Sequence, residues 1–160
     1  MKVRHVGLIS DTHGLLRPEA IAALQGSELI LHAGDVGKEE VLDELKKIAP
    51  VIAIRGNVDT AAWCSKLKET ELVETASATF YLIHNITDLN LNPAAAGIHI
   101  VLFGHVHQPT QYEKGGVLYI NPGSAGPRRF NLPISLAKLD LSQLPWHFEL
   151  IHLPANPSSR

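Results

Sequence analysis

The chain has 160 residues, of which 45% are hydrophobic and 19% charged, a composition typical of one globular domain that buries about 70% of its unfolded surface. Its formal net charge of -2 argues against a dedicated binder of nucleic acids or acidic membranes, because such proteins carry a marked excess of positive charge. The single cysteine, Cys64, excludes a disulfide framework within the chain, and we interpret it as a buried side chain.

The first half of the chain alternates between short aliphatic runs and helical patterns. The runs Val3 to Ile9, Leu29 to His32 and Val51 to Ile54 each end in a polar loop, which predicts three buried strands. Between them, Pro18 to Leu24 and Lys38 to Ile48 carry apolar residues at helical spacing. This alternation predicts a largely parallel sheet with right-handed crossovers.

The second half has the pattern of strands with few helices between them, apart from a short helix expected near Pro93 to Ala96. Lys114-Gly115-Gly116 predicts a hairpin turn. We expect these strands to form a second, mixed sheet packed on the first. The expected strands are Glu71 to Thr75, Thr79 to His84, Ile98 to Phe103, Val117 to Ile120, Ile134 to Leu139 and Trp146 to Leu153.

Residues 1–153 are expected to form a single domain and residues 154–160, with two prolines and two serines, a frayed tail. The N-terminal segment lacks the apolar core of a secretion signal, and no apolar stretch approaches the ~20 residues that span a bilayer. We therefore expect a soluble, cytoplasmic protein without membrane contacts. A homo-oligomer is an open alternative to a monomer.

Five of the apolar runs end in side chains that can bind a metal ion. Because ligands bind beyond the carboxyl ends of parallel strands, these side chains are expected to meet at one edge. Any one of them alone has a plain explanation as a loop cap, a turn residue or a hydrogen-bonded histidine. Asp-X-His and His-X-His pairs after two separate buried strands favour a site, since buried polar groups need partners. The seven side chains are Asp11, His13, Asp35, Asn57, His84, His105 and His107.

The chemistry of this set points to divalent transition metals. Four imidazoles, two carboxylates and one amide oxygen suit Mn²⁺, Fe²⁺, Ni²⁺ or Zn²⁺, whereas an all-oxygen magnesium or calcium site needs no imidazole. Seven ligands exceed the needs of one tetrahedral ion but suit two ions that share a bridging carboxylate. Two metal ions held in this way stabilise the attacking and the leaving oxygen atoms when a nucleophile displaces a group at phosphorus.

The seven side chains lie within short motifs, which are Asp11-Thr12-His13, Gly34-Asp35, Gly56-Asn57, His84 and Gly104-His105-Val106-His107. In this order they resemble the sequence blocks of the calcineurin-like metallophosphoesterases. The short length and Asn121-Pro122-Gly123-Ser124 resemble its small YfcE-like phosphodiesterase subgroup. The resemblance covers Val3 to about Ser124 and implies an α/β fold, a four-layer α/β/β/α sandwich of two mixed sheets flanked by helices.

The resemblance also implies a ligand set and an activity. One metal ion would be held by Asp11, His13, Asp35 and His107, and the second by Asp35, Asn57, His84 and His105. Asp35 would bridge the two ions, a metal-bound hydroxide would be the nucleophile, and Asp35, Asn57 and His84 would take part in catalysis.

We therefore expect a binuclear phosphodiesterase that uses two divalent ions, foremost Mn²⁺, on a small phosphodiester, without a stable nucleic-acid complex. The alternative is a non-catalytic interaction scaffold that resembles the retromer subunit of this fold. That subunit has an incomplete ligand set, whereas every ligand position is filled here, which favours the enzyme.

Several other positions bear on the chemistry. Asn85 stands where the family usually has glycine; asparagine tolerates left-handed backbone better than most residues, so the loop can be kept, and the effect of this change on His84 stays open. Val58 stands where larger phosphatases carry a histidine, which leaves no obvious proton donor, with Asp59 as an alternative. Arg55 and Arg128 are expected to bind phosphate oxygens, and exposure to solvent is the alternative for at least one of the Arg128-Arg129 pair.

Three further residues have open or negative assignments. His32, three residues before Asp35, either orients a metal ligand or is a core histidine. Ser124 and Cys64 are not expected to act as nucleophiles, because Ser124 lacks the spacing of a nucleophile elbow.

Overall fold

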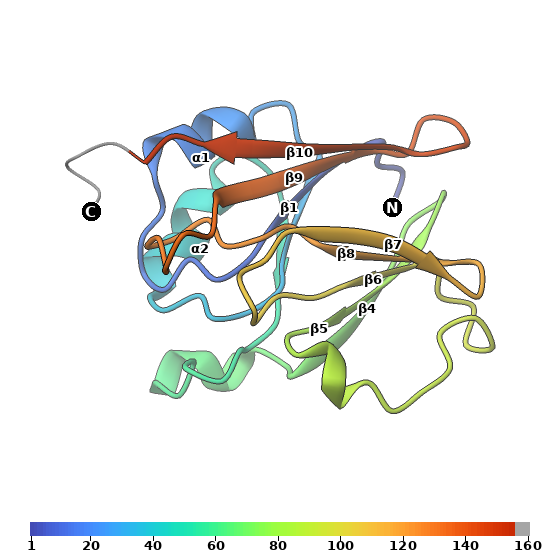
Figure 1. Ribbon diagram of the computed structural model, residues 1–160, viewed down its shortest axis with the longest axis horizontal. Coiled ribbons are helices and arrows are strands. Elements are labelled where there is room, and N and C mark those ends of the chain that lie inside the picture. The colour runs from blue at the N-terminus through green and yellow to red at the C-terminus, as the bar shows by residue number, and fades with distance from the viewer. Residues whose placement is uncertain (156–160) are drawn as a thin grey trace.

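Two β-sheets lie face to face in the computed structural model, which describes residues 1–155 (Figure 1). The first sheet has the strand order β10-β9-β1-β2-β3. Its strands β1 (His5–Ile9), β2 (Leu29–His32) and β3 (Val51–Ala53) run parallel, as the alternation of strands and helices predicts. Strands β9 (Ile134–Asp140) and β10 (His147–Leu153) complete the sheet in antiparallel orientation.

The placement of β9 and β10 corrects the sequence prediction, which assigned both to the second sheet. β1 pairs with β2 along one edge and with β9 along the other, so that His5 lies opposite Asp140 and Leu8 opposite Ala137. Because five of the seven residues of β9 are buried, this strand needs cover on both faces, which a place beside β1 provides.

The second sheet has the order β4-β5-β6-β8-β7. Strands β5 (Thr79–Ile83), β6 (Ile100–Leu102) and β8 (Val117–Asn121) are parallel, while β4 (Thr70–Glu74) and β7 (Thr110–Lys114) are antiparallel edge strands. The sequence prediction missed β7, because all five of its residues are exposed and no apolar alternation marks it. The predicted turn at Lys114-Gly115-Gly116 connects β7 to β8.

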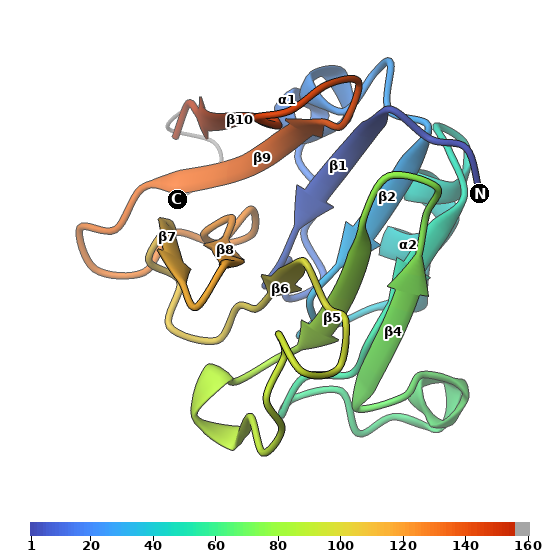
Figure 2. The same cartoon turned by 90° about the vertical axis from the view of Figure 1, so that its right-hand side faces the viewer.

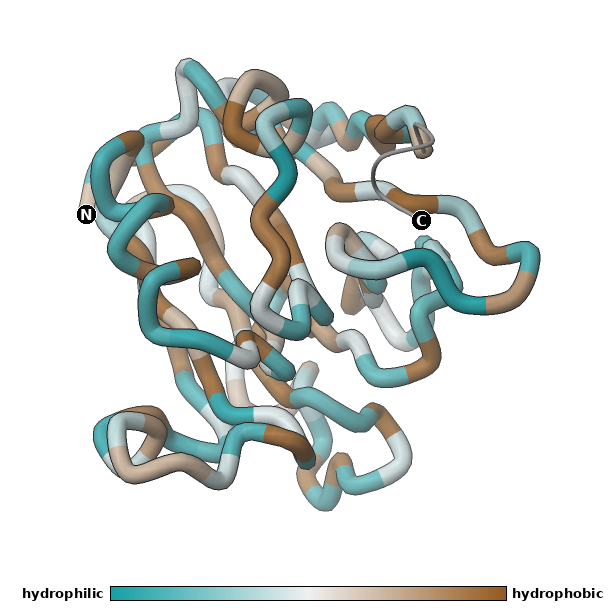
Figure 3. Tube along the Cα trace, turned by 90° about the vertical axis from the view of Figure 1, so that its left-hand side faces the viewer, coloured by the Kyte–Doolittle hydropathy of each residue, from teal (hydrophilic) through white to brown (hydrophobic). Residues whose placement is uncertain are grey.

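The main hydrophobic core lies between the sheets. Alternate residues of β1 and β2, such as Val6, Leu8 and Leu31, contact Phe80 and Leu82 of β5 in one cluster of buried side chains, as the two-residue period of a strand requires. Figure 3 shows the hydrophobic stretches along the strands and hydrophilic stretches along most of the loops. This core holds the two sheets together and fixes the strand ends that carry the predicted site.

Helices α1 (Pro18–Ala23) and α2 (Glu39–Lys46) cover the outer face of the first sheet. A Cβ atom at Gly7 would collide with Leu24, so glycine allows α1 to approach β1 closely. A 3₁₀ helix, η1 (Ala62–Lys66), follows β3. Among residues 1–155, no helix is long and apolar enough to cross a membrane.

The outer face of the second sheet has a thinner cover. The 3₁₀ helix η2 (Ile86–Asp88) and the following loop pack Ile86, Leu89 and Ile98 against Val101 and Tyr119. The segment near Pro93 to Ala96 forms a hydrogen-bonded turn and not the expected helix. Two mixed sheets flanked by helical segments confirm the predicted fold class. The frayed tail expected at residues 154–160 lies mostly outside the described residues.

Candidate metal centre

The loops that follow β1, β2 and β6 meet at one end of the sandwich (Figure 2). The N–H groups of Asp11 and His13 donate to the carbonyls of Gly34 and Asp35, at 3.0 and 2.9 Å. From the second sheet, the N–H of His105 donates to Asp11 Oδ2 at 3.1 Å. The parallel arrangement thus brings these predicted site residues together from three loops.

The backbone at this junction is strained. Among residues 1–155, six residues other than glycine have a positive φ, and five of them are predicted metal ligands. Such a conformation is costly for a residue with a side chain and persists where the surrounding structure enforces it, as in functional sites. The five residues and their φ angles are Asp11 (56°), His13 (47°), Asp35 (56°), His105 (75°) and His107 (62°).

Two glycines allow the loops to approach the carboxylates. A Cβ atom at Gly56 would collide with the carboxylate of Asp35, and one at Gly104 would collide with Ser10 and the carboxylate of Asp11. The Gly-Asn and Gly-His motifs of the sequence therefore have a steric basis, because any larger residue would displace a candidate ligand.

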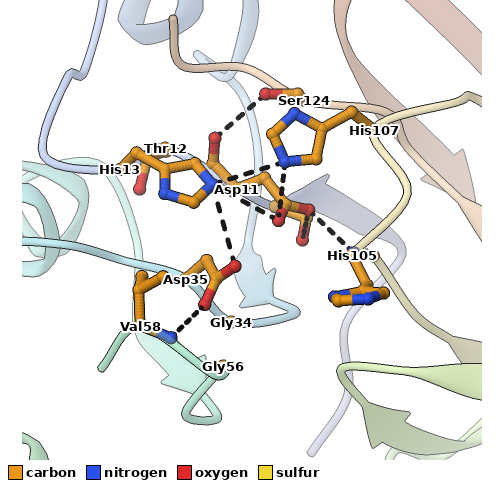
Figure 4. A network of polar contacts seen from close by, with 12 residues as sticks. Asp11, Thr12, His13, Gly34, Asp35, Gly56, Val58, His105, His107 and Ser124 are labelled. Atoms are coloured by element: carbon orange, nitrogen blue, oxygen red, sulfur yellow. Dashed lines mark hydrogen bonds and ion pairs between the residues drawn. The ribbon is translucent and has the colours of Figure 1, made fainter. Parts of the chain in front are cut away.

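Asp11 presents one carboxylate oxygen to the histidines and anchors the other (Figure 4). Oδ2 accepts the Ser10 hydroxyl at 2.7 Å and the His105 N–H. Oδ1 is buried without a hydrogen bond and lies 3.3, 3.7 and 3.8 Å from the Nε2 atoms of His107, His13 and His84. Burial raises the pKa of this carboxyl, but its contacts with His107, His13 and Ser10 outweigh burial and hold the pKa far below its usual range.

Asp35, like Asp11, has one oxygen bound to a backbone N–H and the other facing the histidines. Oδ1 accepts the N–H of Val58 at 3.0 Å, while Oδ2 lies 3.1 Å from His84 Nε2 and 3.7 Å from His13 Nε2. Burial raises the pKa of the Asp35 carboxyl, but the contact with His84 and the hydrogen bond from Val58 outweigh burial, so the pKa lies below its usual value. Both carboxylates are therefore held as anions.

The histidines present their Nε2 atoms to the same space. His84 Nδ1 lies 2.7 Å from the carbonyl oxygen of Ala33, and this contact requires the proton on Nδ1. Burial lowers the pKa of His84, but the contacts with the Asp35 carboxylate and the Ala33 carbonyl outweigh burial and raise it. A carbonyl that orients the far nitrogen of an imidazole in this way is typical of metal-binding histidines.

The donor atoms fit divalent metal ions. Oxygen or nitrogen atoms of Asp11, His13 and His107 lie within 4.8 Å of one another, and so do those of Asp11, Asp35 and His84. Asp11 Oδ1 and His84 Nε2 are buried polar atoms without a hydrogen bond, and such atoms call for a partner. The two groups share Asp11, whereas the resemblance gives the bridging role to Asp35, so that assignment stays a prediction.

The remaining two predicted ligands lie at the border of these groups. The ring of His105 is half-buried and stands edge-on to that of His84, with centroids 5.3 Å apart. Asn57 is exposed. Both line a cleft of about 650 Å³ that opens beside His84, so they are near the centre, and their role as ligands stays a prediction.

Asp59 holds two of the site loops together, a role that the sequence prediction missed. Its carboxylate accepts the N–H groups of Val36 (3.1 Å), Gly37 (3.0 Å) and Gly56 (2.9 Å). It is 5% exposed. These three donors keep Asp59 occupied as an acceptor, which argues against the alternative that it donates a proton to a leaving group.

His32, at the end of β2, connects the loops that follow β1 and β2. Gly34 N–H donates to its Nδ1 at 3.1 Å, and its Nε2 lies 3.0 Å from the Thr12 hydroxyl, which donates to the Val36 carbonyl. His32 is fully buried, and burial lowers its pKa to about 4. It is therefore a neutral core histidine that also positions the chain next to Asp11 and Asp35, which unites the two alternatives.

Other predicted residues lie in different places. Asn85 has φ −113°, so the left-handed backbone that asparagine tolerates is not used here; its side chain accepts the N–H and hydroxyl of Thr87 at the start of η2. Arg55 lines the cleft, whereas Arg128 is exposed and lines a separate hollow of about 190 Å³. The Ser124 hydroxyl donates to the Asp11 carbonyl at 3.0 Å, which fits a structural residue.

Comparisons with known proteins agree with this architecture. The family model for the calcineurin-like phosphoesterase superfamily domain matches residues 4–144, and the chain belongs to that superfamily. A protein of Methanothermobacter thermautotrophicus named "Probable metallophosphoesterase" is 33% identical over 152 residues, which cover 87% of this chain and 88% of that protein. The phosphodiesterase YfcE of Escherichia coli is 27% identical over 161 residues, covering 82% and 84% of the two chains.

Among solved structures, Vps29 of Chaetomium thermophilum superposes with a TM-score of 0.81 at 16% identity, covering 98% of this chain and 91% of that one. At this level of identity the likeness concerns the fold alone.

Proposed function

We propose that the protein is a metal-dependent phosphodiesterase that hydrolyses small phosphodiesters. The observation that carries the proposal is the convergence of Asp11 Oδ1 and Asp35 Oδ2 on the Nε2 atoms of His13, His84 and His107. Membership in the phosphoesterase superfamily and likeness to a phosphodiesterase support it. A pair of divalent ions, foremost Mn²⁺, would neutralise phosphate charge there and lower the pKa of a bound water.

Residues around the centre would complete the metal ligands, take part in catalysis and bind the phosphate. His105 and Asn57 would complete the ligand set from the rim of the cleft, and Asp35, Asn57 and His84 would act in catalysis through their contacts with the reacting group. The Arg55 guanidinium lines the cleft and would contact a phosphate oxygen. Arg128, which lies in a separate hollow, would meet only an extended substrate. We retain residence in the cytoplasm and one domain over residues 1–153 as sequence-based proposals.

The test is hydrolysis of bis(p-nitrophenyl) phosphate by the purified protein after chelation and after readdition of Mn²⁺, Ni²⁺ or Ca²⁺. We expect chelation to abolish turnover and Mn²⁺ or Ni²⁺ to restore it better than Ca²⁺. Full activity after exhaustive chelation would contradict the proposal. A protein that binds Mn²⁺ without hydrolysing any aryl diester would favour the scaffold alternative instead.

A further inference from the structure

The cleft beside the candidate metal centre has the size of a small-molecule site, because its volume of about 650 Å³ lies within the range of about 300–1,000 Å³ for such sites. The candidate ligands His84 and His105 line it, and the buried Nε2 of His84 has no hydrogen bond. Its other walls come from residues 55–60, the start of β4, β5 and residues 85–90. A phosphodiester held at the centre would therefore extend one of its alcohol arms into this cleft.

Negative charge predominates in the lining. Arg55 is the cationic side chain there, and its Nη2 lies 3.4 Å from Oε1 of Glu69, which offsets its charge. Asp59 is bound to three backbone N–H groups and Asp88 is exposed without an ion-pair partner among residues 1–155. The lining thus includes three carboxylates and one guanidinium.

The rest of the lining offers hydrogen bonds. Thr60, Thr70 and Tyr81 contribute hydroxyl groups, and Asn85 and Asn90 contribute amides. The Asn85 oxygen already accepts two hydrogen bonds from Thr87, so its NH₂ group is left as a donor. Such groups suit the hydroxyls of a polar alcohol better than an aliphatic chain.

We propose that this cleft binds one alcohol arm of the substrate and that Glu69 and Asp88 discriminate against arms that carry a second negative charge. The inference rests on the proposed phosphodiesterase function and narrows its substrate class to diesters of neutral or cationic, hydroxyl-bearing alcohols. The metal centre would neutralise the charge of the phosphate itself. A carboxylate or second phosphate on the arm would lie near Glu69 and Asp88 and be repelled by them. Because Glu69 and Asp88 are exposed, the discrimination is several-fold and falls with salt.

The experiment uses symmetric diesters, so that either arm entering the cleft has the same charge. Binding of bis(2,3-dihydroxypropyl), bis(choline) and bis(2-carboxyethyl) phosphate to the Mn²⁺-loaded protein is measured by calorimetry at low and high ionic strength. Asp88→Asn and Glu69→Gln remove the charges singly. Asp43→Asn, on the exposed side of α2, is the matched control outside the cleft.

We expect the wild-type protein to bind the carboxylated diester about fivefold or more weakly than the neutral one at low salt, and the difference to shrink at high salt. Asp88→Asn and Glu69→Gln should each reduce the ratio, while Asp43→Asn preserves it. Equal affinities in the wild type, a ratio unchanged in both variants, or no binding of any diester would overturn the inference. Charge discrimination without hydrolysis of aryl diesters would contradict only the proposed function.

Discussion

The Nε2 atoms of His13 and His107 face each other at 3.3 Å, although 94 positions separate the two residues in the chain. Both atoms also face Asp11 Oδ1, at 3.7 and 3.3 Å. The lone pairs of two neutral imidazoles repel at such a distance unless a proton or a metal ion lies between them. This pair, held by strained backbone on two different loops, is therefore suited to share a cation with Asp11.

The first prediction concerns that pair. His107→Ala should weaken Mn²⁺ binding by at least about tenfold, because it removes one of three donors around Asp11 Oδ1. Calorimetric titration with Mn²⁺ measures the effect. His147→Ala, which changes an exposed histidine of β10, is the control and should bind Mn²⁺ like the wild type. An unchanged affinity in His107→Ala would exclude His107 as a ligand.

The second prediction concerns Asp35. In Asp35→Asn, the amide oxygen can keep the hydrogen bond from Val58, which turns the NH₂ group toward His84 Nε2. This NH₂ would donate to the lone pair that faces the centre, so we expect kcat/KM for an aryl diester to fall at least about a hundredfold. The melting temperature should change little. Asp43→Asn is the matched control, and retained turnover in Asp35→Asn would contradict the assignment of Asp35 as a ligand.

The third prediction separates positioning from proton donation at Asp59. Asp59→Ala leaves three N–H groups without an acceptor, of which that of Val36 is buried and those of Gly37 and Gly56 are partly buried. Because a buried donor without a partner costs about 1–3 kcal/mol, we expect a loss of about 2 kcal/mol or more in the free energy of unfolding. Asp59→Asn keeps one acceptor oxygen and should lose less. Denaturation curves and pH–rate profiles measure both effects. If Asp59→Asn retained full stability but lost the alkaline limb of the profile, Asp59 would be a general acid after all.

The fourth prediction is a pH dependence of stability. His32 has a pKa of about 4 in the folded protein against an ordinary 6.5, so above pH 6.5 it is neutral in both states. As the pH falls from 6.5 toward 4, the unfolded chain takes up a proton that the folded protein refuses. The free energy of unfolding should therefore drop by up to about 3 kcal/mol over this range.

His32→Asn isolates this contribution, because asparagine can still accept the Gly34 N–H but does not titrate. Denaturation at a series of pH values should give a flatter dependence for the variant than for the wild type. Parallel curves for the two proteins would show that His32 does not resist protonation.

Local pattern predicted β1, β2, β3, α1 and α2 and six of the strands beyond them, but not the short η1, because buried runs and amphipathic spacing are properties of neighbouring residues. The sheet that β9 and β10 join depends on which strand edge is free, and no local pattern records that. β7 consists of exposed, mainly polar residues, so the alternation that reveals half-buried strands is missing from it.

The candidate ligands were predictable for a related reason. Asp11, Asp35 and His84 come shortly after apolar runs, and parallel strands align their carboxyl ends. The role of Asp59 was not predictable, since its three donors lie on loops up to 23 residues away. The sequence left open the effect of Asn85 in place of the family glycine; in the structure its backbone is extended and its side chain caps η2.

The last prediction concerns the ester type. Val58 is 46% exposed beside Asp35, and its N–H donates to Asp35 Oδ1, so a new side chain can be introduced without changing that hydrogen bond. Without a general acid, which contributes typically 10²–10⁴-fold, aryl diesters should be hydrolysed faster than matched monoesters. Val58→His should raise kcat/KM for a p-nitrophenyl monoester and Val58→Thr should not, because threonine has the size of valine and no comparable acid. A wild-type preference for monoesters at saturating Mn²⁺ would mean that Arg55 or another donor supplies the missing stabilisation.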